Sequence, residues 1–462
     1  MSRTPPITDR LDIDYDAGVE RLCDFLKIPS VSTDPAYQAH IAEAAQWVAD
    51  HLQTSGLKAD LCQTAGHPVV LGRTTDDDVA DPAAPRVLFY GHYDVQPPDP
   101  LEKWTTGPFE PTVRDGSLYA RGASDDKGQV ACFLEALRAY KDAGQKLPCH
   151  VTVMIEGEEE CGSVGLPGFL DAYHEQLKAD IVVVSDTTMW DANTPAITYA
   201  MRGLVYFDLK LHGPNRDLHS GVYGGTLANP ATVLPRVLAR LFDDDNRITI
   251  PGFYDDVAPL DDEESKRWAG LGFKDEDFLG PLGSQPFGEA GYATLERRWA
   301  RPSCDINELY GGYMGEGAKT VIPSFAGAKV SFRIPANMDP VKVARQFTDW
   351  LNGQNTGGCR WEIQQHGEAY PVAVPIDSPY IAAATRAIQQ AKGRPPVLVR
   401  DGATIPIIAD FKRKLGLDTL LIGFGLNEDG IHSPDEHFAL DRFKLGCKTH
   451  ALLLAEVAGV GR

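Results

Sequence analysis

Five short apolar runs along the chain predict β-strands that are buried in a sheet. Each run spans five or six residues and ends at or shortly before a histidine or an acidic residue. The runs cover residues 86–91, 117–122, 151–155, 181–185 and 419–423. Apolar runs of this length are typical of strands in a parallel sheet, because both faces of such a sheet are covered.

Amphipathic segments between these runs predict helices. Apolar residues recur at helical spacing along 41–54, 128–143 and 378–392. Strands that alternate with helices predict an α/β domain with a mostly parallel sheet and helices on both faces. Ligands of such sheets bind beyond the carboxyl ends of the strands. We therefore expect the histidine and acidic residues after the runs to gather at one edge of the sheet.

The pattern changes near Met201. Apolar and polar positions alternate along 204–211 and 329–334, which predicts half-exposed antiparallel strands. A helix is predicted over 229–242. The segment 243–300 is polar and rich in Gly, Pro and Asp, so it predicts loops and short helices.

This change of pattern predicts two domains. A discontinuous α/β domain comprises residues 1–200 and 373–462, and an α+β domain of residues 201–372 is inserted into it. The length of 462 residues is sufficient for two domains of this size.

Composition and charge argue against several classes of function. The chain carries 65 acidic and 44 basic residues, a formal net charge of −21. This balance argues against nucleic acid and against anionic membrane surfaces as partners. Eight cysteines without a C-x-x-C pair argue against a disulfide scaffold or a structural zinc ribbon. Since no apolar signal segment or membrane-spanning run is visible, we expect a cytoplasmic protein.

Histidine and acidic residues with possible metal-binding roles follow the predicted strands. His92 and Asp94 are two residues apart at a strand end, so their side chains point the same way. A carboxylate beside a metal-bound imidazole fixes its tautomer. Asp125 precedes a predicted helix, where an acidic residue also fits an ordinary helix cap. Taken alone, none of these residues defines a site.

Acidic residues at the other strand ends favour a bound cation. The run 156–160 holds four glutamates directly after a predicted core strand, where like charges repel unless a cation binds. Asp186 ends the most apolar strand, and His432 lies in a loop after the last one. His437 is an alternative to His432 that spacing alone does not exclude.

Together these residues predict a centre for two metal ions. Two histidines and three carboxylates form a nitrogen and oxygen ligand set that suits Zn²⁺ or Mn²⁺ and lacks the thiolates of structural zinc sites. The expected ligands are His92, Asp125, Glu160, Asp186 and His432. Two divalent cations activate a bridging water for hydrolysis. Glu159, next to a ligand, is the candidate general base.

Longer motifs resemble a known family along nearly the whole chain. They are GHYDVQP (91–97), ARGASDDKG (120–128), EGEEECGS (156–163), VSD (184–186), DLHSGVYGG (217–225), GGYMGEGAKTVIP (311–323), SFR (331–333) and GIHSP (430–434). In kind and in order they are similar to the dinuclear-zinc metallopeptidase family of carnosine dipeptidases, carboxypeptidase G, peptidase T and acetylornithine deacetylases. The dipeptidase branch fits best, through DLHSGVYGG and GEGAKTVIP.

The resemblance assigns the metal ligands to two sites. It implies that Asp125 bridges both ions. It further implies that His92 and Asp186 complete one site, and that Glu160 and His432 complete the other.

The resemblance also implies catalytic roles. Asp94 would orient His92, and Glu159 would act as the general acid and base. The peptide bond between Asp125 and Asp126 would be cis.

The inserted domain is implied to serve as a lid and a dimerisation domain. Arg333 would grip the terminal carboxylate of the substrate, which suits a bidentate guanidinium. His219 would stabilise the oxyanion from the partner subunit, which implies a homodimer. Thr320 and Thr404 align with positions that contact substrate. From the residues alone, Arg333 also fits a surface ion pair and His219 fits a turn cap.

These features predict an enzyme. The expected reaction is metal-dependent hydrolysis of the amide bond of dipeptides or small peptides by a water that bridges the two ions. An N-acyl-amino-acid deacylase with the same metal site is one alternative, and a metal-dependent binding protein without catalysis is another. The intact Glu159 and Asp94 argue against the binding protein, because a pure binder does not need a general base.

Overall fold

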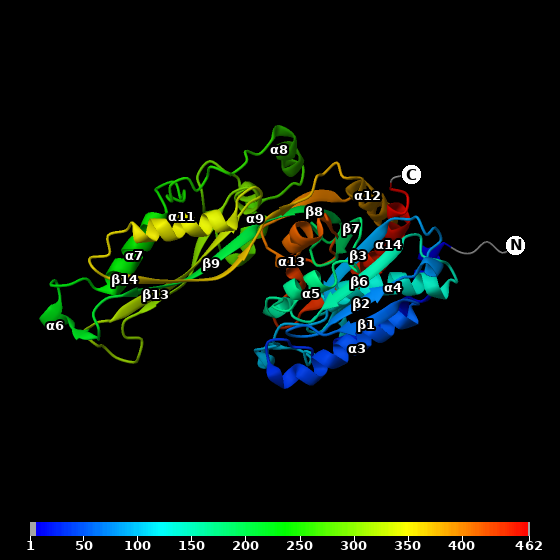
Figure 1. The fold of residues 1–462 in the computed structure, drawn as a ribbon, viewed down its shortest axis with the longest axis horizontal. Helices are drawn as coiled ribbons and strands as arrows, with labels where there is room; N and C mark the ends of the chain where they lie inside the picture. The colour runs from blue at the N-terminus through cyan, green and yellow to red at the C-terminus, as the bar shows by residue number, and fades with distance from the viewer. Residues whose placement is uncertain (1–5, 461–462) are drawn as a thin grey trace. The chain divides into compact units, whose positions relative to one another are not determined.

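The computed structural model describes residues 6–460, and the chain divides into two compact units (Figure 1). The first unit comprises Met1–Tyr199, Val374–Val399 and Asp410–Arg462. The second unit comprises Ala200–Ala373 and Arg400–Ala409. The last of these segments lies in the second unit, although the expected boundaries put it with the first. Within the described residues, no helix has both the length and the apolar character that a membrane crossing needs.

A nine-stranded sheet runs through the first unit. In spatial order its strands are β1 (Lys58–Cys62), β2 (Val69–Arg73), β6 (His150–Glu156), β3 (Arg86–His92), β7 (Ile181–Val184), β17 (Thr419–Leu421), β8 (Ala196–Met201) and β15 (Val372–Ala373), and β16 (Val397–Asp401) also pairs with β8. The four central strands β6, β3, β7 and β17 run parallel. The pairs β1–β2, β2–β6, β17–β8 and β8–β15 are antiparallel. The parallel centre confirms the α/β fold class.

Among the described residues, the first unit contains seven α-helices that pack around its sheet, and three of them match the predicted amphipathic segments. They are α1 (Ile7–Ile13), α2 (Tyr15–Leu26), α3 (Gln38–Thr54), α4 (Lys127–Asp142), α5 (Leu166–Ala172), α12 (Pro379–Lys392) and α14 (Leu440–Val457). Three of them, α3, α4 and α12, are the predicted helices. Sequence marks the start of α12: Ser378 caps it by accepting a hydrogen bond from the Tyr380 amide at 3.3 Å, and Pro379 takes the first helical position.

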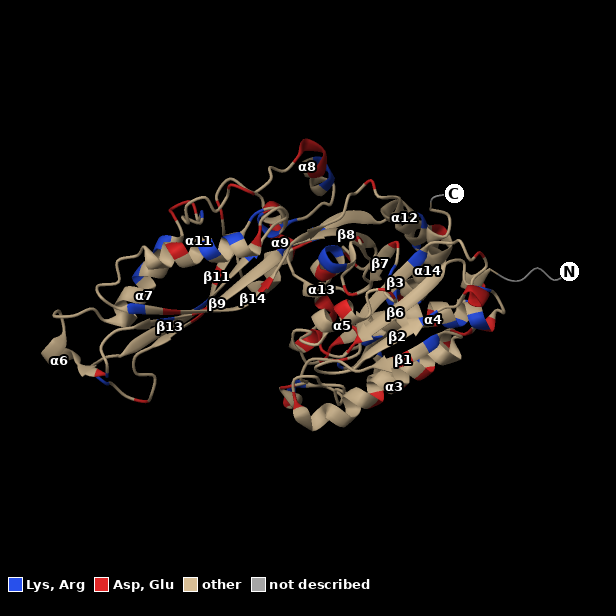
Figure 2. Cartoon of the chain, viewed as in Figure 1, with Lys and Arg blue, Asp and Glu red and all other residues tan. Residues whose placement is uncertain are grey.

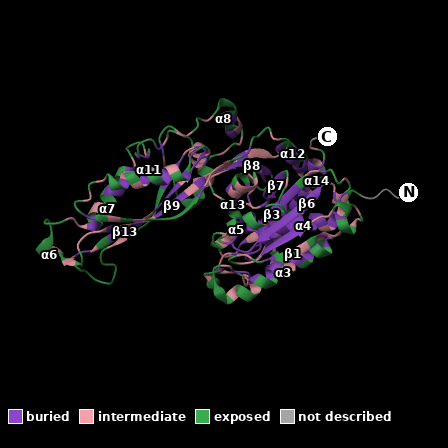
Figure 3. Ribbon diagram, in the orientation of Figure 1, coloured by how far each residue is buried: buried purple, intermediate pink, exposed green. Residues whose placement is uncertain are grey.

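Two neighbouring residues of β3 show that both faces of the sheet are covered. Side chains alternate between the faces along a strand. Phe89 stacks on Phe133 of α4, with ring centroids 3.8 Å apart, and meets His450 of α14 edge-on. Tyr90 points to the other face and meets Phe411, in a helical segment before β17. The central strands are buried along most of their length (Figure 3).

The prediction of a core strand at residues 117–122 is wrong. The structure has only β5 (Ser117–Tyr119) there, in a separate antiparallel sheet of order β18–β5–β4. Its partners are β4 (Thr112–Arg114) and β18 (His437–Ala439). Only Leu118 of β5 is buried, because this short strand covers the core with one face alone.

A four-stranded antiparallel sheet forms the frame of the second unit. Its order is β11 (Ser303–Gly311), β13 (Phe325–Ile334), β9 (Gly203–His212) and β14 (Arg360–Ala369). Burial alternates along β9, as the sequence pattern predicts. The buried side chains share a core with α7 (Pro230–Leu238) and α11 (Pro340–Asn352). Two further strands, β10 (Leu218–His219) and β12 (Val321–Ile322), pair beside the short helix α6 (Ser220–Tyr223).

The segment 243–300 forms loops and short helices, as predicted. The helices are α8 (Asp262–Ala269), α9 (Asp275–Leu279) and α10 (Thr294–Trp299), while α13 (Pro406–Asp410) lies later in the chain. Asp261 caps α8 by accepting a hydrogen bond from the Glu264 amide at 2.7 Å. Acidic residues in the first turn of α8 and basic residues in its last turn complement the helix dipole (Figure 2). Trp268 packs edge-on against Trp299, which ties α8 to α10.

Candidate metal centre

His92 is fully buried at the carboxyl end of β3, and its two ring nitrogens face different carboxylates. Nδ1 lies 3.1 Å from the carbonyl oxygen of Asp94 and 3.3 Å from its carboxylate, whereas Nε2 lies 3.1 Å from Oδ1 of Asp125. Burial disfavours the imidazolium, but the hydrogen bonds to Asp125 and Asp94 raise the pKa of His92 well above its ordinary value. Because Asp94 engages Nδ1, Nε2 is the nitrogen available to a metal.

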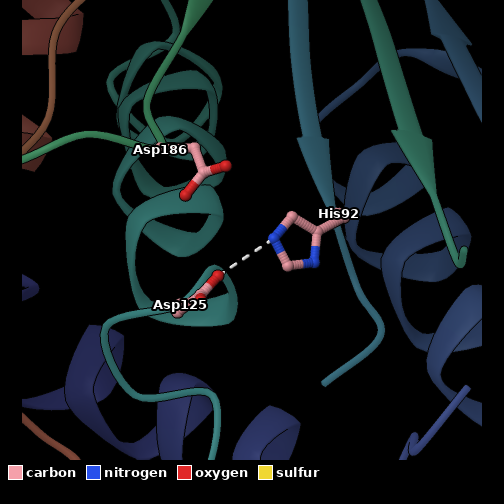
Figure 4. A group of neighbouring side chains, drawn as sticks. All are labelled: His92, Asp125 and Asp186. Atoms are coloured by element: carbon pink, nitrogen blue, oxygen red, sulfur yellow. Dashed lines mark hydrogen bonds and ion pairs between the residues drawn. The ribbon is translucent and has the colours of Figure 1, made fainter. Parts of the chain in front are cut away.

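Asp125 precedes α4, and its two carboxylate oxygens face two different histidines. Oδ1 faces His92 (Figure 4), and Oδ2 lies 2.9 Å from Nε2 of His432. Burial would raise the pKa of Asp125, but the two histidines lower it below its ordinary value. The peptide bond between Asp125 and Asp126 is cis, which confirms that expectation. A carboxylate oriented in this way can bridge two cations through its two oxygens.

Glu160 and His432 lie on the other side of Asp125 from His92. Nε2 of His432 is 3.3 Å from Oε2 of Glu160, and the same oxygen accepts a hydrogen bond from Gln96 at 2.8 Å. Hydrogen bonds to Asp125 and Glu160 raise the pKa of His432 to about 10. The imidazole is half exposed, so this end of the centre is open to solvent.

Asp186 follows β7 and points toward His92 and Asp125 (Figure 4). Burial and the negative charges of Asp126 and Asp125 raise the pKa of Asp186 well above its ordinary value. Within the described part of the chain, its carboxylate has no hydrogen-bond partner. A half-buried carboxylate without a donor is costly unless a proton or a cation binds it.

The donor atoms fit two divalent cations. They form two groups, and within each group the ligand atoms lie within 4.8 Å of one another. One group is His92, Asp125 and Asp186, and the other is Asp125, Glu160 and His432. Asp125 belongs to both groups, so the two sites would share one carboxylate. Imidazole and carboxylate donors without thiolates are typical of catalytic rather than structural metal sites.

Glu159 lies next to these groups without belonging to either. Burial and the charges of Glu160 and Asp125 raise its pKa to about 7, although His92 acts in the opposite direction. No hydrogen bond reaches its carboxylate from residues 6–460. Such a group can take up and release a proton near neutral pH.

The remaining glutamates of the acidic run have protein partners. Glu156 accepts a hydrogen bond from the Tyr90 hydroxyl at 2.5 Å, and Glu158 accepts one from the Gly165 amide at 2.9 Å. These contacts give both side chains a structural role. Only part of the run is therefore available to a metal.

Glu436 is a buried residue of the site that sequence reasoning missed. Its carboxylate accepts hydrogen bonds from the amides of Gly122, Ser124 and Asp125 at 2.9 to 3.1 Å, and from the Arg121 guanidinium at 2.8 Å. These four bonds fix the loop that carries Asp125. The sequence offered one signal, Arg121 directly before the GASDD motif, because an arginine next to a buried motif needs an acidic partner.

Asp429 supports the same loop, and it was also missed. It accepts a hydrogen bond from the Ser124 hydroxyl at 2.9 Å and forms a buried ion pair with Arg442. His437, the alternative to His432, instead stacks on Tyr119 within the small antiparallel sheet. It belongs to neither group of candidate ligands.

The predicted substrate-binding residues all lie in the second unit, where they form two pairs. Arg333 donates a hydrogen bond to Oγ1 of Thr404 at 2.7 Å, and it makes no ion pair with any described residue. The amide after His219 donates to the carbonyl oxygen of Thr320 at 3.1 Å. Nδ1 of His219 accepts a hydrogen bond from the amide two residues later, at 2.9 Å, so in this chain it caps a turn.

The comparisons with known proteins agree with a dinuclear hydrolase site. A family model described as Peptidase family M20/M25/M40 matches residues 88–456. The chain belongs to this peptidase family. The match covers every candidate metal ligand and both ends of the second unit.

Relatives in the M20 family match over nearly the whole chain. The Cys-Gly metallodipeptidase DUG1 of Candida albicans is 34% identical over 96% of this chain and 95% of its own. The Beta-Ala-His dipeptidase of Homo sapiens is 31% identical over 97% and 91%. The M20 family metallo-carboxypeptidase Sso-CP2 from Sulfolobus solfataricus superimposes with a TM-score of 0.85 at 31% identity, covering 96% of this chain and 99% of that one. The protein is therefore a metal-dependent peptidase of the M20 family.

Proposed function

We propose that this M20 peptidase hydrolyses dipeptides at a centre of two metal ions. The observation that carries the proposal is the orientation of Asp125, whose two oxygens face two histidines in two separate ligand groups. The Candida Cys-Gly and human Beta-Ala-His dipeptidases, both full-length relatives, support dipeptides as the substrate class.

In this proposal His92, Asp125, Asp186, Glu160 and His432 hold the two ions. The ions supply Lewis-acid activation of water and polarise the scissile carbonyl. Imidazole and carboxylate donors support Zn²⁺ or Mn²⁺ as their identity. Asp94 keeps Nδ1 of His92 protonated, so that Nε2 stays available as a ligand.

Glu159 is the proposed general base and acid. Its carboxylate lacks a hydrogen-bond donor among the described residues, and burial raises its pKa above the ordinary value, which suits it to take a proton from water and return it to the leaving amine. Asp186 and Glu160 lack this freedom, because ligands stay deprotonated while a metal is bound.

We also propose that the second unit binds the substrate. Arg333, positioned by Thr404, would bind the terminal carboxylate of a dipeptide, since no carboxylate among residues 6–460 forms an ion pair with it. His219 and Thr320 would reach the scissile carbonyl from the partner subunit of a homodimer, with the second unit as lid. The edge strand β11 exposes both Ile306 and Leu309, which supports the second unit as an association surface.

A cytoplasmic location is part of the proposal. All eight cysteines are free thiols, seven of them buried or half-buried, and free thiols persist in a reducing compartment.

The test is metal content and product analysis on one preparation. The protein should carry about two metal ions per chain. It should cleave a panel of dipeptides, lose activity on chelation and regain it with Zn²⁺ or Mn²⁺. The Glu159→Gln variant should keep its metal but lose roughly 10²–10⁴-fold in kcat. The matched control is Glu175→Gln, an exposed acidic residue of the same unit.

Three outcomes would contradict this assignment. Cleavage of acetylated amino acids in preference to dipeptides would favour the deacylase. Bound metal with no hydrolysis of either would favour a binding protein. Full activity of Glu159→Gln would remove that residue as the general base.

A further inference from the structure

The segment 243–300 forms much of the wall of a cavity that is partly open to solvent, within the second unit. Its volume is about 640 Å³, and its lining comes mainly from this segment and the first residues of β11. Pockets that bind small molecules typically measure about 300–1,000 Å³. Phe242, Ile248, Phe278 and Phe287 supply apolar walls. The cavity therefore has the size and the lining of a site for a small organic molecule.

The charge of this cavity opposes the charge of the chain. Its lining contains four arginines and two carboxylates, a net charge of +2, whereas the whole chain carries −21. The arginines are Arg202, Arg297, Arg298 and Arg301, and the carboxylates are Glu289 and Asp305. A positive cavity in an acidic protein favours an anionic ligand over a neutral or cationic one.

Two of the four arginines form structural contacts within the wall of the cavity. Arg301 forms a two-pronged ion pair with Glu289, at 2.5 and 2.7 Å. Arg297 donates to the carbonyl oxygen of Glu289 at 3.0 Å. Both side chains hold the turn before α10, and the charge of Glu289 is neutralised by Arg301. Arg297 keeps its charge because its partner is a neutral carbonyl, so Arg202, Arg297 and Arg298, set against Asp305, account for the net charge of +2.

Among the described residues, neither Arg202 nor Arg298 has a carboxylate as a direct partner. Arg202 donates there to two neutral acceptors, the Gly402 carbonyl at 3.1 Å and the Ser303 hydroxyl at 3.2 Å. Arg298 lies over the ring of Phe278, 4.5 Å from its centroid, and within the described chain it makes no ion pair. Burial, then the charges of Arg333 and Arg298, lower the pKa of Arg202 to about 10. An anion between Arg202 and Arg298 would relieve this repulsion.

Two further groups in the lining lack partners that a ligand would supply. The Thr294 hydroxyl is buried and has no hydrogen-bond partner in the part of the chain that the structure describes. Phe287 is 83% exposed, although it is a large aromatic residue. A ligand with a hydrogen-bonding anionic head and an apolar body would satisfy both. Asp305 and the nearby Asp401 limit the negative charge that the ligand can carry, because they repel a highly charged anion.

We propose that this cavity of the second unit is a further binding site, distinct from the metal centre, and that it binds a small carboxylate that carries an aromatic ring. Arg202 and Arg298 bind the carboxylate, Thr294 donates to it, and the ring packs among Phe242, Phe278 and Phe287. A single planar carboxylate matches two guanidinium groups, and the aromatic walls give a bare phosphate nothing to contact. The site does not depend on the dipeptidase proposal.

Calorimetric titration of the metal-loaded full chain with 3-phenylpropionate tests this proposal. We expect saturable binding that weakens at least about tenfold in Arg298→Gln, because a desolvated charge contact is lost. Arg236→Gln, an exposed arginine on α7, is the matched control and should bind like the wild type. Arg333→Gln should weaken binding less than Arg298→Gln does, because Arg333 acts on Arg202 only through its charge, and this difference separates the cavity from the proposed substrate site. The neutral 3-phenylpropionamide should bind at least about tenfold more weakly than the acid.

The comparison of the acid with its amide needs no variant, so it tests the need for a carboxylate even if Arg298→Gln misfolds. Equal binding of acid and amide would overturn the proposal. So would binding that Arg333→Gln abolishes and Arg298→Gln retains, because the ligand would then occupy the substrate site. Inorganic phosphate bound as tightly as 3-phenylpropionate, with the same dependence on Arg298, would replace the aromatic carboxylate with a simple anion. Absence of saturable binding to the wild type would remove the site.

Discussion

Glu436 fixes the loop of Asp125 through four hydrogen bonds, and it pairs with Arg121 where both side chains are almost fully buried. In Glu436→Gln the amide NH₂ would face a backbone N–H, and Arg121 would lose its counter-charge. We expect a loss of about 3–5 kcal/mol in the free energy of unfolding. Metal affinity should fall roughly 10–100-fold, because the orientation of Asp125 is no longer fixed. Denaturant unfolding and metal titration measure the two effects.

The neighbouring Asp435 provides the control for this prediction. Its carboxylate is 33% exposed and pairs with Arg114 and Thr105 at the surface. Asp435→Asn should cost less than about 1 kcal/mol, because exposed pairs contribute little. Equal losses in the two variants would mean that the burial of Glu436 is not the cause.

His450 makes stability depend on pH through its burial. Three phenylalanine rings surround it, and burial lowers its pKa from 6.5 to about 3. Between these values the unfolded chain binds a proton that the folded protein excludes, so stability is lost as pH falls from 6.5 toward 3. This loss approaches about 1.4 kcal/mol per pH unit. The melting temperature of His450→Gln should therefore fall less steeply over this range. Parallel curves for variant and wild type would contradict the prediction.

At the scale of elements, Gly91 sets the distance between β3 and α4. A Cβ at this position would lie 2.5 Å from Val130 and 2.7 Å from Asp126, both on or next to α4. Gly91→Ala should destabilise the protein by about 1–3 kcal/mol, because a packed core does not accept an added methyl group. It should also lower activity, since His92 is the next residue. Thermal unfolding and dipeptide hydrolysis measure the two effects.

Gly168 in α5 provides a control, because we expect its replacement to change stability in the opposite direction. It is exposed, and a Cβ there would meet nothing within 4 Å. Gly168→Ala should stabilise the protein by about 0.4–1 kcal/mol, because the unfolded chain loses freedom. If Gly91→Ala were equally harmless, β3 and α4 would be able to move apart.

The central strands and main helices could be predicted because their signal is local. Continuous apolar runs identified β3, β6, β7 and β17, and amphipathic spacing identified α3, α4 and α12. The run 117–122 was predicted wrongly, because a segment that mixes apolar and polar residues fits either a core strand or a surface strand with one buried face. Only tertiary pairing with β18, more than 300 residues later, decides between them.

The candidate site shows the same limit. The five expected ligands could be proposed from the sequence because their residue types follow the predicted strand ends. The structure brings their ligand atoms into two groups that share Asp125. Glu436 was missed because its role depends on Arg121, 315 residues away in sequence. The cavity of the second unit was missed because its arginines are spread over a polar segment without periodicity.

For the molecule as a whole, metal binding should be coupled to proton release. In the metal-free protein the pKa of His432 is raised to about 10, so its imidazole carries a proton at neutral pH, and burial raises the pKa of Asp186 well above its ordinary value, which favours its protonated form. Metal ligands must be deprotonated, so metal uptake releases these protons. Calorimetry in buffers of different ionisation enthalpy should detect the release, and Asp186→Asn should reduce it. Metal at 100 times its dissociation constant should add about 2.7 kcal/mol of stability.

Binding heats that are independent of the buffer would contradict this coupling. They would mean that the ligands are already deprotonated before the metal arrives. An unchanged melting temperature on chelation would show that the centre contributes nothing to the fold.

The contact between Asp125 and His432 joins residues 307 positions apart. A ribosome adds roughly 5–20 residues per second, so His432 is synthesised roughly 15–60 s after Asp125. During that interval the nascent chain can present His92, Asp125 and Asp186, but it lacks His432 of the second group. With the proposed ligands, the second metal site is completed only after His432 has been synthesised. A fragment that stalls before His432 should therefore bind metal only at the first group.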